Sequence, residues 1–300
     1  MELTLLGLFV VAGAASLFMA WVIGAGSSGA TPFAPAVGAN AVSTMRAALV
    51  VGVLGFAGAV TQGGNVSEAV GSGLIGGVSL PATGVITVLL IGAGLMAVGI
   101  KTGYPIATAF TVTGAVVGVG LALGGTPVWS KYAQVGTVWV LTPFVGGGIA
   151  YGIASVLPRP TVPEHRSVPV LAALVGAVLA NVAFVGLGPG GAPGSLAGFA
   201  GRLVGVPGFL VPAASTLLVA TAVAALVSWD IRRDEAGGLR RVLLAMGSLV
   251  AFSAGGSQVG LAVGPLLPLV EGILPVVAVL AGGGVGILVG SWTGAPRMIK

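Results

Sequence analysis

Charged side chains interrupt this chain so rarely that they divide it into nine long uncharged stretches. Each stretch has at least 21 residues, and an α-helix needs about 20 residues to cross the hydrocarbon layer of a bilayer. The pattern therefore predicts an all-α integral membrane protein with about nine transmembrane helices. The uncharged stretches are 3–45, 47–67, 69–100, 102–130, 132–158, 167–201, 203–229, 242–270 and 272–296.

The first stretch is too long for one crossing, because it contains 43 residues. Its residues 24–38 hold two prolines, four glycines and three hydroxyl side chains. A helix break at membrane depth is tolerated only where protein or a water-filled cavity surrounds it. Transporters place their substrates at such breaks, so we expect a broken or re-entrant segment with a binding function here.

Composition narrows the class of protein further. Hydrophobic residues make up 56% of the chain and charged residues 6%, with a mean hydropathy of +1.12, whereas soluble domains carry about 25% charged residues. The 54 glycines are typical of closely packed membrane helices. The absence of cysteine excludes disulfides and thiolate metal sites. Because Met1 and Glu2 provide no basic region, we expect the first stretch to be retained and not cleaved as a signal peptide.

The positions of the basic residues predict an orientation in the cell membrane. With the N-terminus outside and one crossing per stretch, only Lys131 and Arg202 of the 12 basic residues lie outside, as the positive-inside rule requires. Residues 229–241 then form a cytoplasmic loop between an N-terminal repeat region, 1–228, and a partial second repeat, 242–300. The net charge of +5 is explained by topology, and no basic stripe suggests nucleic acid as a partner.

A weak internal repeat relates the two parts of the chain. When residues 25–35 are aligned with 255–265, glycine, serine and proline coincide, and Ser27 pairs with Ser257. Seven of the predicted crossings separate the two copies. An odd number makes them enter the membrane from opposite sides, which is the arrangement of an inverted-repeat transporter. We therefore expect residues 25–42 and 255–266 both to be non-helical or broken near the membrane midplane.

Five segments resemble, in order, the motifs of the inorganic phosphate transporter (PiT) family. Residues 25–43, AGSSGATPFAPAVGANAVS, resemble its signature GANDVANSFATSVGSGAIT. Residues 63–70, GGNVSEAV, resemble GGNVTETI, and residues 104–118 resemble LPVSTTHSIVGAIVG. Residues 251–266, AFSAGGSQVGLAVGPL, resemble AFSHGANDVANAIGPL, and 290–300 resemble the segment that follows it. The resemblance implies a secondary transporter of phosphate that is coupled to protons or sodium. It also implies that the family has further spans after the segment that matches residues 290–300, so we expect this chain to be a C-terminally short member.

The chain departs from the family at the residues that carry chemistry. Where both family signatures have an Asn-Asp pair, this sequence has Ser27 and Ser28 in the first copy and Ser257 and Gln258 in the second. The aspartate implied as a ligand for the coupling cation is therefore absent from both copies. Phe110 also stands where the STTH motif has histidine.

The remaining polar groups can still bind an oxyanion. Backbone N–H groups at the N-termini of broken helices, together with hydroxyl donors, favour a dianion without any lysine or arginine. Each hydroxyl has an ordinary alternative, which is a hydrogen bond to a carbonyl of its own helix or to a neighbouring helix. The substrate-binding candidates are Ser27, Ser28, Thr31, Thr108, Thr111, Ser257 and Gln258.

Glu68 is the candidate residue for the coupling ion. It is the sole carboxylate between Glu2 and Glu164, and it matches the glutamate of the family motif. Acidic groups near membrane depth tend to be proton or cation sites. The alternative is an interfacial charge at the end of a span.

Three functions compete on this basis: a phosphate transporter, a transporter of sulfate or another oxyanion, and a non-transporting membrane subunit. An enzyme is not expected, because the sequence offers no His–carboxylate or Cys–His pair for acid–base or metal chemistry. No cofactor is expected either. The expected partners are the oxyanion, a proton or sodium ion and the lipid bilayer, and the sequence leaves open whether the chain forms a homodimer.

Overall fold

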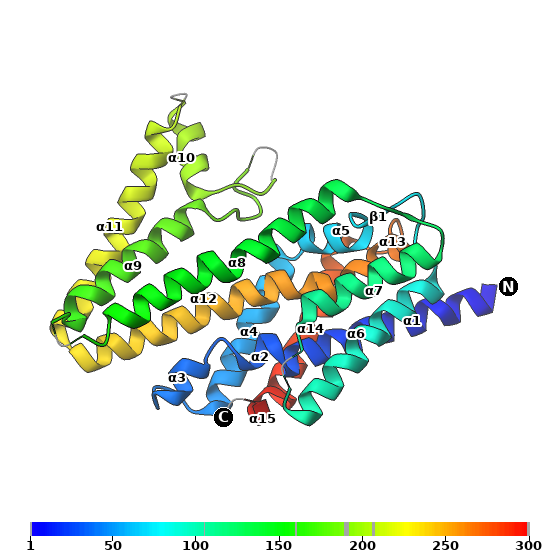
Figure 1. Ribbon diagram of the computed structural model, residues 1–300, viewed down its shortest axis with the longest axis horizontal. Coiled ribbons are helices and arrows are strands. Elements are labelled where there is room, and N and C mark those ends of the chain that lie inside the picture. Colours follow the sequence, from blue (N-terminus) through cyan, green and yellow to red (C-terminus); the bar gives the residue numbers. More distant parts are fainter. Residues whose placement is uncertain (1, 105, 160, 189–191, 206–207, 299–300) are drawn as a thin grey trace. The chain divides into compact units, whose positions relative to one another are not determined.

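The chain folds almost entirely into α-helices in a computed structural model, which describes residues 2–104, 106–159, 161–188, 192–205 and 208–298 (Figure 1). The all-α prediction is confirmed. One short antiparallel ladder pairs β1 (Ile75–Gly76) with β2 (Thr126–Pro127). The longer helices are α1 (Glu2–Ala25), α4 (Thr44–Gln62), α6 (Ala82–Thr102), α7 (Thr108–Ala122), α8 (Trp129–Val156), α9 (Glu164–Asn181), α11 (Leu210–Arg233), α12 (Glu235–Val263) and α14 (Val276–Thr293). The shorter ones are α2 (Ser27–Ala30), α3 (Ala34–Gly38), α5 (Gly64–Ser72), α10 (Leu196–Val204), the 3-10 turn η2 (Gly264–Leu266), α13 (Leu267–Val270) and α15 (Ala295–Met298).

Within the described residues, seven helical stretches are long and apolar enough to cross a membrane. Helix α7 is also apolar but has only 15 residues. Two of the predicted uncharged stretches are only partly helical, because 73–81 contains β1 and 182–195 separates α9 from α10. The count of nine crossings stays a prediction.

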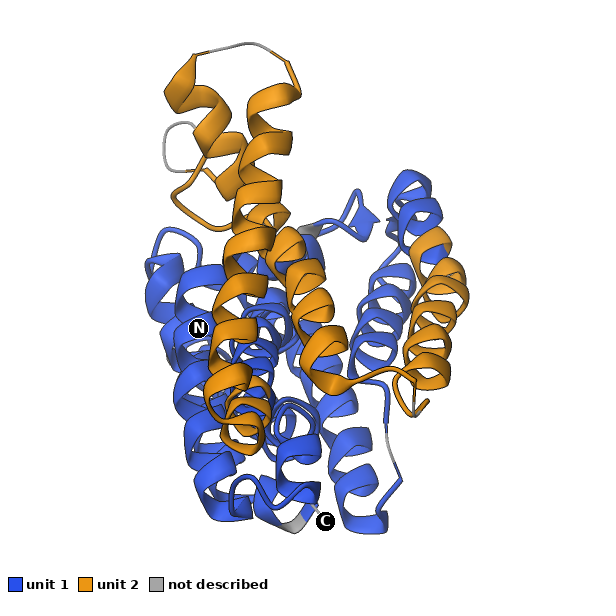
Figure 2. Ribbon diagram, turned by 90° about the vertical axis from the view of Figure 1, so that its left-hand side faces the viewer, with its two compact units in different colours: residues 1–136, 243–300 blue, residues 137–242 orange. Residues whose placement is uncertain are grey.

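The chain forms two compact units (Figure 2). Unit 1 contains residues 1–136 and 243–300, and unit 2 contains residues 137–242. The borders fall inside α8 and α12, so each of these helices begins in one unit and ends in the other. The predicted division into repeat regions 1–228 and 242–300 concerns ancestry and topology, and it stays a prediction.

Glycine allows the helices of unit 1 to approach one another closely. Helix α1 packs against α6 and α14, and α14 also packs against α4. A Cβ atom added to Gly290 would lie 2.0 Å from the carbonyl oxygen of Trp21, and one added to Gly24 would lie 2.1 Å from that of Ile287. Such backbone contact between helices is possible only with small residues. The abundance of glycine thus explains how α1, α4 and α14 form one core.

Helices α9 and α11 of unit 2 run antiparallel. A Cβ added to Gly176 would lie 3.0 Å from the Cα of Ala220. One helical turn further along α9, the Asn181 side-chain amide donates to Thr216 Oγ1 at 3.0 Å. The first residues of α9 therefore lie beside the last residues of α11.

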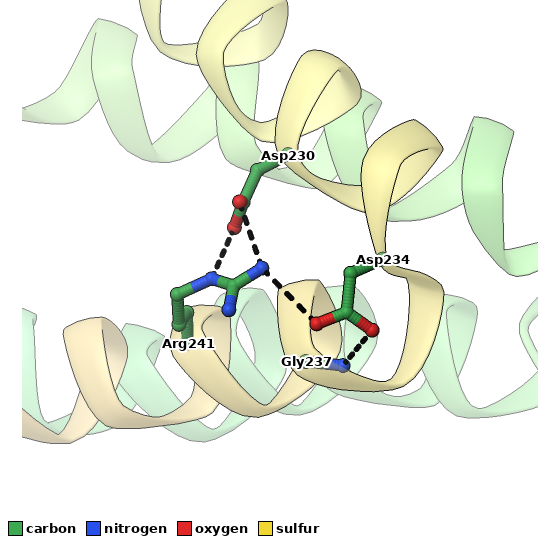
Figure 3. Close-up of polar contacts among 4 residues, drawn as sticks. All are labelled: Asp230, Asp234, Gly237 and Arg241. Atoms are coloured by element: carbon green, nitrogen blue, oxygen red, sulfur yellow. Dashed lines mark hydrogen bonds and ion pairs between the residues drawn. The ribbon is translucent and has the colours of Figure 1, made fainter.

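The expectation of a loop at 229–241 was wrong at the level of secondary structure. Helix α11 continues to Arg233, and α12 begins at Glu235. Asp234 alone is extended, and its carboxylate accepts a hydrogen bond from the backbone N–H of Gly237 at 3.0 Å (Figure 3). Arg241 Nε and Nη2 donate to the two carboxylate oxygens of Asp230 at 2.7 and 2.8 Å. The charged residues thus cap and cross-link two helices instead of forming a flexible loop, since their side chains satisfy the helix ends.

The two predicted helix breaks have different outcomes. In the first copy the break is confirmed, because α1 ends at Ala25 and Gly26 leaves the helical region with φ −98° and ψ −90°. In the second copy the predicted break across 255–266 was wrong for its first nine residues, which continue α12 to Val263. The two copies also differ in proline. The first copy contains Pro32 just after α2, whereas the second copy has Ala262 at the matching place and meets its proline only at Pro265, within the 3-10 turn.

Candidate functional site

The break after α1 brings together two of the predicted substrate-binding residues. Ser27 is the first residue of α2, and Thr108 is the first residue of α7. Their hydroxyl oxygens lie 3.4 Å apart, the long end of the range for a hydrogen bond, although 81 positions separate them in the sequence. Thr108 is buried and Ser27 is half-buried. The signature motif and the STTH-like motif therefore meet at this pair.

Close packing fixes the segment that carries Ser27. A Cβ added to Gly29 would lie 2.9 Å from the hydroxyl oxygen of Ser291 on α14. The buried Ser28 hydroxyl donates to the carbonyl oxygen of Ile23 at 3.1 Å, across the break itself. Ser28 therefore stabilises the turn in this structure, and its hydroxyl proton is already committed to the protein.

Three other predicted residues also direct their hydroxyl groups at nearby backbone. Thr31 donates to the carbonyl oxygen of Ser27 at 2.7 Å. Thr111 donates to Ala107 at 3.0 Å, and Ser257 donates weakly to the carbonyl of its own helix at residue 254, at 3.3 Å. These contacts are the ordinary alternative for hydroxyls in membrane helices. Each oxygen nevertheless keeps lone pairs with which it can accept a hydrogen bond.

Gln258 differs from the other candidates. Its side-chain oxygen Oε1 is buried and accepts no hydrogen bond from any residue that the structure describes. A buried carbonyl-type oxygen without a donor is costly, and such groups are usually paired with water, an ion or a ligand. Gln258 thus offers an acceptor at the position that corresponds to Ser28 of the first copy.

Glu68 lies on a helix that packs against the second signature copy. Its neighbour Ser67 is fully buried, and its hydroxyl donates to the carbonyl oxygen of Gly63 at 2.8 Å. Added Cβ atoms on Gly260 and Gly264 would each lie 2.7 Å from the backbone of Ser67. Residues 63–70 therefore contact residues 251–266, with the Glu68 side chain itself exposed.

Sequence reasoning missed three buried hydroxyl groups. Ser67 and Ser291 are fully buried, and Ser16 is nearly so. Ser16 donates to the carbonyl oxygen of Ala262 at 2.9 Å and so joins α1 to α12. Ser67 stands beside Glu68 inside a recognised motif, so the motif alone was a sufficient signal for it. Ser16 lies in an unremarkable apolar stretch and gave none.

The electrostatics at Ser27 and Thr108 suit an anion. The first turn of an α-helix leaves backbone N–H groups without intrahelical acceptors, and the helix dipole places partial positive charge there. Thr108 is the first residue of the 15-residue α7, so its hydroxyl group and the N-terminal backbone of this helix both favour an anionic ligand. All the predicted residues are neutral hydrogen-bonding residues, and none of them is basic.

Comparison with known proteins identifies the family. The sequence pattern of the phosphate transporter family matches residues 12–300. The chain belongs to the phosphate transporter family. A protein of Pyrococcus horikoshii named as a phosphate permease is 28% identical over 308 residues, which cover 94% of this chain and 73% of the relative. A phosphate permease, by name, of Pyrococcus abyssi is 29% identical, with coverage of 95% and 74%.

A solved structure confirms the fold of this phosphate transporter family member. It is described as the sodium-dependent phosphate transporter, and it superposes with a TM-score of 0.69. The identity is 22%, and the match covers 97% of this chain and 76% of the other. The prediction of family membership is confirmed by the pattern match, and the roles of individual residues stay predictions.

Proposed function

We propose that this chain is a secondary transporter that moves inorganic phosphate across the cell membrane. The observation that carries the proposal is the contact between Ser27 and Thr108, because it joins two family motifs at a helix break beside the N-terminus of α7. A broken helix supplies backbone N–H donors inside a membrane protein. Those donors and the two hydroxyls provide a neutral site for a dianion.

Sulfate is the alternative substrate, because neither signature copy has the aspartate that would discriminate between the two anions. Phosphate at neutral pH retains a proton that it can donate, whereas sulfate is only an acceptor. A carboxylate would therefore select phosphate, but the positions of the signature aspartates hold Ser28 and Gln258. Gln258 Oε1 can accept a hydrogen bond from the P–OH group of phosphate, which sulfate lacks at neutral pH, and this favours phosphate over sulfate.

Uptake by purified protein in liposomes tests this function. Vesicles are loaded with buffer and given radiolabelled phosphate or sulfate outside, with empty liposomes as the control. We expect saturable phosphate uptake that excess unlabelled phosphate inhibits and excess sulfate inhibits less. Uptake equal to that of empty liposomes under every imposed gradient would support a non-transporting subunit instead.

We further propose that transport is driven mainly by protons, with Glu68 as the group that carries them. The two positions where a carboxylate would ligate sodium are neutral here, which weakens cation binding. A proton needs only one titratable group. We also propose an inverted repeat that relates residues 25–42 to 255–266, and an external N-terminus.

A further inference from the structure

Exposed apolar side chains stand at the end of α10, at the start of α11 and at Phe209 in the turn between them. Leu203 and Phe209 have exposed fractions of 77% and 76%, and Val204 and Leu210 are also exposed. These four residues form what we call the apolar tip of unit 2. A turn between helices that reaches water is normally polar, so four exposed apolar side chains require another explanation.

The apolar tip is not a by-product of packing within unit 2. Helix α10 uses its small residues to pack on its neighbours: Ala197 is buried, and a Cβ added to Gly201 would lie 3.2 Å from the ring of Pro212. The one charged residue nearby, Arg202, directs its guanidinium back to the carbonyl oxygen of Leu187. The polar group therefore points toward the unit, and the apolar groups point away from it.

The length of α11 places the apolar tip at a membrane boundary. Its charged end contains Asp230, Arg232 and Arg233, and its 24 residues extend for about 36 Å at 1.5 Å per residue. The hydrocarbon layer is about 30 Å thick. If the charged end lies at one surface, Leu210 lies at the other. Exposed leucines at 217, 218 and 226 form an apolar surface along α11, and the tip continues it.

We propose that the apolar tip inserts into lipid at the boundary of headgroups and acyl chains, in the leaflet opposite the charged end of α11. Leucine, valine and phenylalanine side chains at this depth remove apolar area from water and so anchor the hairpin. The anchor fixes the height of unit 2 in the bilayer. It does not depend on which anion is carried.

Spin labels can test this placement, because the chain contains no cysteine. Leu203→Cys, Phe209→Cys and Leu210→Cys would be labelled one at a time and reconstituted in liposomes. Collision rates with oxygen, which concentrates in lipid, and with a water-soluble nickel chelate would then be measured. Leu218→Cys in mid-α11 and Ala236→Cys at the charged end serve as references for lipid and water, and gel filtration of each variant checks folding.

We expect oxygen to exceed the chelate at all three tip positions, with a ratio severalfold above that of Ala236→Cys and below that of Leu218→Cys. Greater access by the chelate at the tip would place it in water and overturn the proposal. Low access by both reagents would also overturn it, because the tip would then be covered by protein, either unit 1 or a second copy of the chain. Because three tip positions are measured, the result does not depend on a single variant that misfolds.

Discussion

The contact between Ser27 and Thr108 provides a direct test of the substrate site. Replacing Ser27 with Ala removes one hydroxyl donor, and a net hydrogen bond of about 1 kcal/mol corresponds to roughly a fivefold rise in KM for phosphate. Phosphate uptake at varied concentration gives this value. Thr61→Ala is the matched control, because its exposed hydroxyl donates only to the carbonyl of its own helix at Ala57. An unchanged KM in Ser27→Ala would remove Ser27 from the site.

Glu68 provides the residue-scale test of coupling. We expect Glu68→Gln to abolish uptake driven by a pH gradient, because glutamine carries no titratable proton. The wild-type chain should respond weakly to sodium. Uptake measured with sodium and proton gradients imposed separately distinguishes the two ions, and Glu164→Gln in unit 2 serves as the control. Strong sodium stimulation in a fully active Glu68→Gln variant would contradict proton coupling.

The sequence singled out the two motifs that meet at Ser27 and Thr108, but not how each side chain is used. The resemblance was sufficient to single out Ser27 and Thr108, because each stands in a segment that matches a family motif. A bond to the same helix was foreseen as the alternative for every hydroxyl, but the sequence could not show that Thr31 and Thr111 are among those that make it. A hydroxyl in a membrane helix has a neighbouring carbonyl within reach in any case, and the rotamer that decides between this carbonyl and a ligand depends on packing.

The close packing of α14 through glycine predicts how two alanine substitutions on this helix change thermal stability. Gly290→Ala should lower the melting temperature in detergent, because its Cβ would lie 2.0 Å from the Trp21 carbonyl oxygen. Overpacking of this kind costs about 1–3 kcal/mol. Gly282→Ala on the same helix meets nothing within 4 Å. It should be neutral or stabilising, since alanine favours a helix over glycine. Equal melting temperatures for the two variants would show that α14 can move away from α1.

Two helix ends in the signature copies lie close to proline. Pro32 follows α2, and Pro265 follows the end of α12, although other prolines stand inside α8 and α9. The charged segment 229–241 looked like a loop because polar runs usually are loops. Its residues instead form a bidentate Arg241–Asp230 pair and a cap at Asp234. Such pairing depends on which residues face each other across a turn, and the order of charges in the sequence does not give it.

At the scale of the whole molecule, the testable property is which end of unit 2 faces the cytoplasm. Antiparallel packing of α9 and α11 puts Arg166 at the same end of unit 2 as Arg232, and Arg202 lies toward the other end. The positive-inside rule then predicts that the first end is cytoplasmic. Ala236→Cys should react with a membrane-impermeant maleimide only in opened cells, and Ala192→Cys should react in intact cells.

The choice of labelled positions follows from the structure. Gly237 is unsuitable for this experiment, because an added Cβ would lie 1.8 Å from a carboxylate oxygen of Asp234. Ser195 is also unsuitable, since its hydroxyl caps α10 by accepting from the backbone N–H of Gly198 at 3.0 Å. Ala236 and Ala192 are exposed and make no side-chain hydrogen bond that a thiol would remove. Reaction of Ala236→Cys in intact cells would reverse the predicted orientation.

Unit 1 is assembled from two distant parts of the chain, and this arrangement constrains the order of biosynthesis. Helices α1 and α4 leave the ribosome early, but α14, which packs against both of them, is made only after unit 2. All of unit 2 is synthesised in between. The nascent chain must therefore keep α1 and α4 in the bilayer with the surfaces that α14 will contact unfilled until α14 has been made. Lipid or the insertion machinery has to cover those surfaces in the meantime.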